Sequence, residues 1–194
     1  MKAGLLAGAG QWLVFTDADQ STSIDQLPAL LRPIVDGFDI AMGSRGLVDS
    51  TFEARQTWFR QKLGNAFGVL ARVLLVRGFR DCQCGFKAFT RRAALDIFGR
   101  VTSPTAIFDV EVVLLSARLG LRVAEVPVRW RHDPDSRLRY DARRAVAVLA
   151  ELLRLRHHWD VVIPPRALVT RMPDRRASEP VTPVVMAATH TEAL

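Results

Sequence analysis

The stretch Gln11-Trp-Leu-Val-Phe-Thr-Asp-Ala-Asp19 is a short apolar run with two carboxylates directly behind it. A continuous apolar run of this length is typical of a strand buried in a parallel sheet, and the preceding Lys2 to Ala7 looks like the end of a helix. Ligands of α/β domains gather at the carboxyl ends of such strands. The sequence therefore predicts a site where Asp17 and Asp19 follow the strand.

Predicted helices and strands alternate along the following residues, which favours an α/β domain. A capping-box pattern at Ser23 to Gln26 predicts a helix through about Asp36. The remaining predicted elements are a strand at Asp39 to Ser44, a long amphipathic helix at Gln56 to Val76, a loop and strand at Asp81 to Thr90, helices at Arg91 to Phe98 and Phe108 to Leu119, a strand at Arg122 to Arg131 whose Pro127 suggests an edge or bulge, and an amphipathic helix at Asp141 to His158.

The composition is that of a globular chain with an arginine-rich positive charge. Of the 194 residues, 49% are hydrophobic and 24% are charged, which excludes a disordered or fibrous protein. Lys and Arg outnumber Asp and Glu by 27 to 20, and nearly all of these cations are arginines, whose planar fork suits phosphate. The charge alone fits nucleic acid, an anionic membrane surface or phosphorylated small molecules. A nucleic-acid partner ranks last, because the chain has no recognised motif for it.

Cysteine usage and the opening segment indicate a cytoplasmic protein. Cys82 and Cys84 are too close in sequence for an ordinary disulfide, which favours a reducing compartment. The apolar opening superficially resembles a secretory signal, but it continues into the Asp17 region without a convincing cleavage site. No uninterrupted apolar run reaches about 18 to 20 residues. We therefore expect neither a signal peptide nor a transmembrane helix.

An isolated Asp-x-Asp pair is more often solvated or part of a helix cap, but here it is the first of five blocks in a fixed order. The blocks are Trp12 to Asp19 with Ser21, Thr22 and Ile24 behind it, Ala41 to Arg45, Asp81 to Lys87, Phe108 to Glu111, and Glu125 to Trp130. Their succession resembles the family 2 glycosyltransferases of GT-A fold, in the branch of dolichyl-phosphate and polyprenyl-phosphate glucosyl- and mannosyltransferases. The resemblance covers roughly Lys2 to Arg156.

The resemblance implies a metal site and a donor-phosphate loop. Asp17 and Asp19 match the aspartates that hold Mg²⁺ or Mn²⁺ against the diphosphate of a nucleotide sugar, while Ser21 stands where several relatives have a glutamine. His132, Ser136 and Arg137 match a loop that closes over the donor phosphates. For His132 a structural role is the alternative.

The resemblance also implies positions for the acceptor and for the sugar. Arg45, Arg55 and Arg60 match the region that binds the acceptor phosphate, with a solvated surface charge as the alternative for each. The sugar-side signature places Asp81, Gln83, Gly85 and Lys87 near the hexose, and Asp81 and Gln83 are counted as catalytic with Asp17 and Asp19. Gly85 would allow a close approach of the backbone.

The acidic pair at Asp109 and Glu111, the two cysteines and the last helix also have structural interpretations. Asp109 and Glu111 begin a predicted helix, where carboxylates favour the helix dipole, and a pocket role is equally open. Cys82 and Cys84 are expected to be small, semi-buried filling residues. The basic helix at Asp141 to His158 could lie on a membrane surface or pack against the sheet.

The function implied by the resemblance is transfer of a hexose from a nucleotide sugar to polyprenyl or dolichyl phosphate with inversion. UDP-glucose is favoured over GDP-mannose, and the protein would be peripheral at the cytoplasmic face of the membrane. An acceptor phosphate is already anionic near neutral pH, so its attack on the anomeric carbon needs no strong general base.

The implied fold is the C-terminal portion of a GT-A, Rossmann-like domain that is incomplete at the N-terminus, without part of the nucleotide site. We expect a partial catalytic domain over 1–137, a basic helix over 138–160 and a Pro/Thr/Ala-rich, disordered tail over 161–194. The alternative function is a catalytically silent remnant or a membrane-associated binding module.

Overall fold

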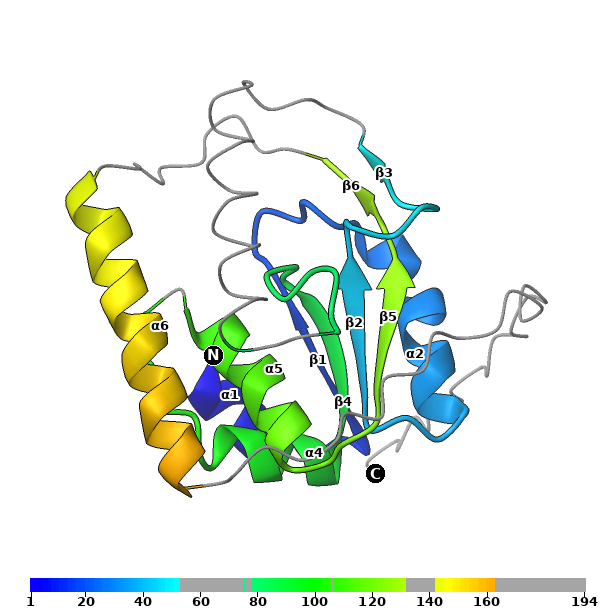
Figure 1. Cartoon of the computed structure of the whole chain (residues 1–194). Helices are drawn as coiled ribbons and strands as arrows, with labels where there is room; N and C mark the ends of the chain where they lie inside the picture. The colour runs from blue at the N-terminus through cyan, green and yellow to red at the C-terminus, as the bar shows by residue number, and fades with distance from the viewer. Residues whose placement is uncertain (53–74, 76–77, 106, 132–141, 163–194) are drawn as a thin grey trace, which may run out of the picture.

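The computed structural model describes residues 1–52, 75, 78–105, 107–131 and 142–162, and its centre is a four-stranded sheet in the order β1-β4-β2-β5 (Figure 1). β4 runs antiparallel to β1 and β2, whereas β2 and β5 are parallel. The carboxyl ends of β1, β2 and β5 therefore share one edge of the sheet with the start of β4. The strands are β1 (Trp12–Thr16), β2 (Ile40–Ser44), β4 (Phe86–Thr90) and β5 (Val123–Pro127).

A small two-stranded sheet lies beyond this carboxyl edge (Figure 1). It pairs β3 (Thr51–Phe52) in parallel with β6 (Arg129–Trp130), and Thr22 forms a bridge to Trp130. β6 follows β5 after a single residue, Val128. The segments after β1, β2 and β5 are thus joined to one another above the main sheet.

Helices cover both faces of the main sheet, which gives three layers (Figure 1). One face carries α2, which a short 3-10 turn, η1, precedes. The other face carries α1, α4 and α5, and α6 packs on the outer side of these helices. The bounds are α1 (Lys2–Ala7), η1 (Ile24–Gln26), α2 (Leu27–Val35), α4 (Arg91–Phe98), α5 (Phe108–Arg118) and α6 (Ala142–Val162).

Each face of the sheet has its own hydrophobic core. Under α2, Leu30 and Ile34 pack with Phe86 of β4 and with residues of β2 and β5. On the opposite face, Phe89 and Phe98 meet edge to face at 5.3 Å in a larger core. Full burial of such side chains contributes about 1.5–3 kcal/mol each, so both cores hold the sheet edge in a fixed position.

α6 packs on this larger core through one side and leaves another side open. Leu152, Leu155 and Trp159 are buried, whereas Leu149 and Leu153 are exposed. Trp159 also donates a hydrogen bond from Nε1 to the buried carboxylate of Glu111, 2.9 Å away. α6 therefore packs on the outer side of the helices and not directly against the sheet, as one of the two interpretations expected, and its membrane role stays a prediction.

Several expected elements are confirmed, in part to the residue. The helix at Lys2 to Ala7 is α1 and the helix at Arg91 to Phe98 is α4. The last helix extends four residues beyond the predicted end, to Val162. Pro127 ends β5 at an edge of the four-stranded sheet, as expected, and the strand predicted at Arg122 to Arg131 divides into β5 and β6.

Two local expectations are wrong. β1 is not a buried strand between parallel neighbours, because it pairs antiparallel with β4 at an edge of the described sheet and Trp12 is 43% exposed. Ser23 forms no capping hydrogen bond. Gln26 instead exchanges two hydrogen bonds with the backbone of Arg129, at 3.0 and 2.7 Å, and so fastens η1 to β6.

Two predicted segments lie outside the described residues. These are the amphipathic helix at Gln56 to Val76, apart from Leu75, and the tail from residue 163 onward. Among the helices that the structure describes, none has both the length and the apolar character needed to cross a membrane.

Candidate active site

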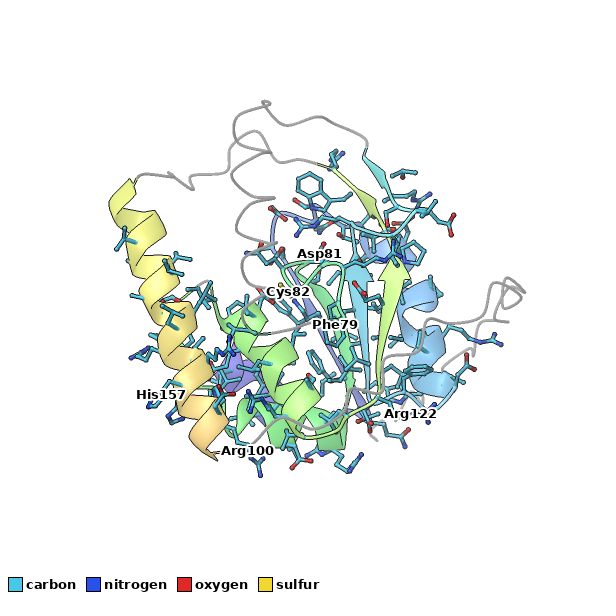
Figure 2. All side chains as sticks on the ribbon, viewed as in Figure 1. Phe79, Asp81, Cys82, Arg100, Arg122 and His157 are labelled. Carbon is cyan, nitrogen blue, oxygen red and sulfur yellow. The ribbon has the colours of Figure 1, made fainter. Side chains whose placement is uncertain are left out.

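The predicted site residues of three blocks converge at the carboxyl edge of the sheet. β1 ends at Thr16 and continues into Asp17, and β2 ends at Ser44 and continues into Arg45. The loop of residues 80–85 enters the same edge, because it leads into the antiparallel strand β4. Figure 2 shows Asp81 of this loop at the end of the sheet toward which β2 and β5 point. Segments that are far apart in sequence therefore form one site.

Gly85 binds the Asp17 backbone and, having no side chain, leaves room for the Asp17 carboxylate. The Asp17 amide donates to the Gly85 carbonyl at 2.9 Å. A Cβ atom at position 85 would lie only 1.9 Å from Oδ2 of Asp17, so no other residue fits without displacing this carboxylate. The close approach expected at Gly85 is thus real, but its partner is Asp17.

The turn that follows β1 also places Asp19. The amide of Gln20 closes the turn onto the Asp17 carbonyl at 3.2 Å, and Gln20 adopts a φ of 50°, which is uncommon for a non-glycine residue. Oδ1 of Asp19 accepts a hydrogen bond from the Ser21 amide at 2.9 Å. Both carboxylates lie on an exposed loop that can be reached by a ligand.

The two carboxylates fit a hard divalent cation whose coordination shell is completed by other oxygens. Asp17 and Asp19 supply carboxylates, the ligand type that Mg²⁺ and Mn²⁺ prefer. Within the described ranges, no group of three or more His, Cys, Asp or Glu residues is arranged to hold a metal ion. A cation here would therefore need oxygens of a substrate or of water as its remaining ligands.

Charge around Asp17 favours a cation. Partial burial raises the pKa of Asp17, and the nearby carboxylates of Asp109 and Asp19 raise it further, against the opposing effect of Lys87 and Arg45. The ionised form of Asp17 is thus less favourable than that of an ordinary aspartate. A bound cation would remove this repulsion.

Lys87 lies beneath the site and does not face a ligand. Its side chain is 1% exposed, and Nζ donates to the Cys84 carbonyl at 2.6 Å and forms an ion pair with Asp109. Burial works to lower the pKa of Lys87, but Asp109 outweighs it and raises the pKa. In the structure the Lys87 ammonium is enclosed by protein groups, and the sugar-binding role implied for Lys87 stays a prediction.

Asp81 is likewise occupied by protein groups. Its Oδ2 accepts from Nε of Arg45 at 2.6 Å and from the Arg45 amide at 3.0 Å. Its Oδ1 accepts from Nη2 of Arg45 and from the Gln83 amide, both at 3.0 Å. Burial would raise the pKa of Asp81, but Arg45 lowers it below the ordinary value. In the structure the Asp81 carboxylate holds Arg45, and its implied sugar-binding and catalytic role stays a prediction.

Arg45 and Gln83 keep side-chain donors that bond to no other residue in the part of the chain that the structure describes. Arg45 uses Nε and Nη2 on Asp81, lies 5.5 Å from the centre of the Trp130 ring, and remains 27% exposed. A guanidinium has five N–H donors, so Nη1 remains for an anionic ligand. Gln83 is half-buried, and only its backbone amide bonds to Asp81.

Sequence reasoning assigned no role to Glu125 and left Asp109 and Glu111 open. Glu125 accepts backbone hydrogen bonds from Arg80 and Asp81 at the start of the site loop. Asp109 pairs with Lys87 below the site, whereas Glu111 fastens α5 to Trp159 of α6. An acidic residue inside an otherwise apolar strand was the one signal that could have pointed to Glu125.

The two cysteines are more deeply buried than expected. Cys82 and Cys84 are each 2% exposed, and both are free thiols. Burial, with a smaller contribution from Asp81, raises the pKa of Cys82 to about 12. These thiols remain protonated near neutral pH, which agrees with a filling role.

Five predicted phosphate-binding residues lie outside the described residues. They are Arg55, Arg60, His132, Ser136 and Arg137. Their roles stay predictions.

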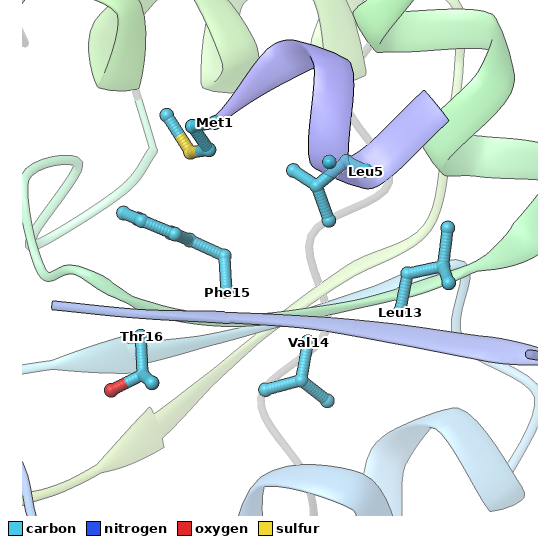
Figure 3. Close-up of a pocket in the computed structure, with 7 residues that line it drawn as sticks. Met1, Leu5, Leu13, Val14, Phe15 and Thr16 are labelled. Atoms are coloured by element: carbon cyan, nitrogen blue, oxygen red, sulfur yellow. The ribbon is translucent and has the colours of Figure 1, made fainter. Parts of the chain in front are cut away.

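A hollow of about 330 Å³ lies beside the site, between α1 and β1 (Figure 3). Met1, Leu5, Leu13 and Phe15 lie on the α1 side of the strand in Figure 3. It shares Thr16 with the edge where the site forms, but neither Asp17 nor Asp19 lines it. Most of its lining side chains are apolar and none is charged, so it differs in character from the charged site.

The chain has clear relatives among curated proteins, although no protein-family model matches it. A dolichyl-phosphate β-glucosyltransferase from Trichomonas vaginalis is 33% identical over 153 residues, 76% of this chain and 45% of the relative. The enzyme of that name from Drosophila melanogaster is 36% identical over 146 residues, 71% of this chain and 44% of the relative. The chain therefore spans less than half the length of these curated relatives.

A solved structure shares the fold. Glucosyl-3-phosphoglycerate synthase from Mycobacterium tuberculosis, in a complex with uridine diphosphate, superposes with a TM-score of 0.50. The match covers 81% of this chain and 52% of the synthase at 14% identity. At this identity the similarity concerns the GT-A fold alone. From its sequence relatives and this fold, the chain belongs to the family 2 glycosyltransferases of GT-A fold, among the relatives of the dolichyl-phosphate β-glucosyltransferases.

Proposed function

We propose that the protein serves the transfer of a hexose from a nucleotide sugar to polyprenyl or dolichyl phosphate. The observation that carries this proposal is the meeting of the Asp17 and Asp19 carboxylates with the Arg45 guanidinium at one sheet edge. An exposed carboxylate pair suits a metal-bound diphosphate, and a fixed guanidinium suits a phosphate monoester. The names of the relatives favour glucose, so UDP-glucose is the first choice of donor and GDP-mannose the second.

Asp17 and Asp19 would hold Mg²⁺ or Mn²⁺, and such a cation supplies neutralisation of the charge that grows on a leaving diphosphate. The two residues would in this way also orient the donor, since the turn after β1 fixes both. Gly85 leaves room for the Asp17 carboxylate, and Lys87 binds the neighbouring Cys84 carbonyl.

Arg45 would bind the acceptor phosphate through its free Nη1 group. An oxygen of this phosphate forms the new bond to the anomeric carbon while the bond from that carbon to the diphosphate oxygen breaks, so the sugar inverts and the nucleoside diphosphate leaves. The attacking oxygen carries no proton near neutral pH, so no general base is required. Alignment of the two anions is the main contribution of the protein.

A lipid acceptor would require the protein to work at a membrane surface. The open side of α6 presents Val146, Leu149 and Leu153 to solvent, with Arg156 nearby on the helix. Apolar side chains flanked by arginine are suited to the interface of an anionic bilayer. We place the protein at the cytoplasmic face, where nucleotide sugars would reach it.

The test is transfer of radiolabelled glucose from UDP-glucose to farnesyl phosphate by the 194-residue chain in the presence of Mg²⁺ or Mn²⁺. Lipid-linked glucose of inverted configuration, formed by the native chain but not by Asp19→Asn, supports the proposal. A parallel reaction with GDP-mannose decides the sugar.

A second candidate is a lipid-phosphate-binding module without turnover, because the matched part is less than half of each relative. Binding of farnesyl phosphate without any product would favour this candidate. Absence of both binding and product would contradict both candidates.

A further inference from the structure

Glu125 is a buried acid on the strand that lies farthest from the Asp17 turn. It belongs to β5, next to β2, and is 4% exposed. Its Oε1 accepts from the amides of Arg80 and Asp81 at 3.1 and 3.0 Å, and its Oε2 accepts from the Arg80 amide at 3.0 Å. A buried carboxylate is costly unless it is hydrogen-bonded, and these loop amides supply the bonds.

These bonds fix the start of the site loop to the sheet. Asp81, whose amide is held by Glu125, turns its own carboxylate to Arg45 and accepts Nε and Nη2 as a bidentate pair. Gly46 allows the two segments to lie this close, because a Cβ atom there would lie 3.1 Å from Cβ of Arg80. A continuous chain of contacts therefore leads from Glu125 through the 80–81 backbone and Asp81 to Arg45.

These contacts set the direction of the Arg45 guanidinium. Nε and Nη2 bind Asp81, and the guanidinium carbon lies 5.5 Å from the Trp130 ring centre, so the plane of Arg45 has little freedom. Nη1 is the guanidinium group that bonds to no residue among those the structure describes. We propose that Glu125 is a positioning residue that orients Arg45 for a phosphate oxygen by way of the 80–81 backbone and Asp81. This inference rests on the proposed function, in which Arg45 binds the acceptor phosphate.

Two substitutions of Glu125 test this role in the 194-residue chain. Glu125→Ala removes both acceptors. Glu125→Gln keeps one acceptor oxygen but turns an amide NH₂ toward the Arg80 amide, so it should have a smaller effect. The first readout is hydrogen exchange of the Arg45 Nε–H by NMR, assigned through its loss in Arg45→Lys. We expect exchange about tenfold faster or more in Glu125→Ala, the scale of losing a hydrogen bond to a charged acceptor.

The second readout is the affinity for farnesyl phosphate, which we expect to fall about tenfold in Glu125→Ala and less in Glu125→Gln. If Glu125→Ala fails to fold, the nearly isosteric Glu125→Gln carries the test with both readouts. The matched control is Glu111→Gln. Glu111 is also buried and also accepts loop amides, from Thr102 and Ser103, but it lies on α5 and has no bond to Arg45 or Asp81.

The outcomes separate positioning from general loosening. Faster Arg45 exchange in the Glu125 variants, with unchanged exchange in Glu111→Gln, supports the inference. Unchanged Arg45 exchange in a folded Glu125 variant, or an equal effect of Glu111→Gln, overturns it. The native chain could instead show a protected Arg45 Nε–H but no affinity for farnesyl phosphate. In that case Arg45 does not bind the acceptor, and the inference that Glu125 orients Arg45 for a phosphate is overturned with it.

Discussion

At the scale of single residues, the sequence predicted that Asp17, Arg45 and Asp81 would belong to one site, and the structure adds that Asp81 pairs with Arg45. The spacing of Asp17 and Asp19 after an apolar strand was enough to predict a turn with two carboxylates. Asp81 and Lys87 were expected to face the sugar, yet their partners are Arg45 and Asp109. A motif shows that residues belong together, whereas the direction of each side chain depends on partners tens of residues away.

Asp19→Asn is expected to lower glucose transfer by about two orders of magnitude or more while leaving the fold intact, because it removes one carboxylate from a site that depends on charge neutralisation. Steady-state transfer assays and thermal unfolding measure the two effects. Asp36→Asn, at an exposed pair with Arg32, is the control and should change neither. Near-normal transfer by Asp19→Asn would remove this residue from the site.

Gly85→Ala is expected to displace the Asp17 carboxylate, since the added Cβ would overlap with Oδ2. Overpacking of this kind costs about 1–3 kcal/mol, and Mn²⁺ affinity measured by calorimetry should fall with it. Gly4→Ala is the matched control, because nothing lies within 4 Å of the new Cβ and alanine favours the helix α1. Unchanged Mn²⁺ binding by Gly85→Ala would show that Asp17 does not hold the metal.

The Asp81–Arg45 pair should persist in acid. Arg45 lowers the pKa of Asp81 in the folded chain, so the stabilisation is fully present above the ordinary aspartate pKa of about 3.9 and is lost as the pH falls through the lower folded value. The stability of the native chain relative to Asp81→Asn, followed by urea unfolding from pH 7 downward, should therefore stay constant to about pH 4 and shrink below it. A difference that disappears well above pH 5 would contradict this direction.

At the scale of elements, helices were easier to predict than strand partners. The predicted bounds of α1 and α4 agree with the structure to the residue, because a helix satisfies most of its hydrogen bonds locally. β1 carries the same apolar run that a central parallel strand would have, so its antiparallel edge position could not be read from it. Gln26 shows a related limit, since its bonds reach Arg129 and not the predicted cap.

Two neighbouring leucines of α6 allow packing and membrane binding to be tested separately. Leu153 is 48% exposed and Leu152 is fully buried. Leu153→Glu is expected to weaken binding to phosphatidylserine vesicles severalfold with a stability change within about 0.5 kcal/mol, as for other surface positions. Leu152→Ala should instead cost about 2–5 kcal/mol with vesicle binding retained when folded. Equal vesicle binding by Leu153→Glu and the native chain would exclude this side of α6 as the membrane contact.

At the scale of the whole molecule, the arrangement follows from strand direction. Because β1, β2 and β5 run the same way and β4 runs against them, blocks around residues 17, 45, 81 and 125 all reach one edge. The order of these blocks in the sequence was sufficient to predict the GT-A fold. It could not show that a carboxylate on β5 supports a guanidinium after β2, since this connection passes through the backbone of a third segment.

The ion pair between Asp81 and Arg45 also constrains which substitutions these two positions can accept during evolution. Loss of Arg45 alone would leave a buried carboxylate without its counterion, and loss of Asp81 alone would leave a guanidinium without its anchor; either single change is more harmful than the two together. The two positions are thus epistatic. A substitution at either position should therefore be tolerated better once the other has changed, so the two residues are expected to change as a pair over evolution and not one at a time.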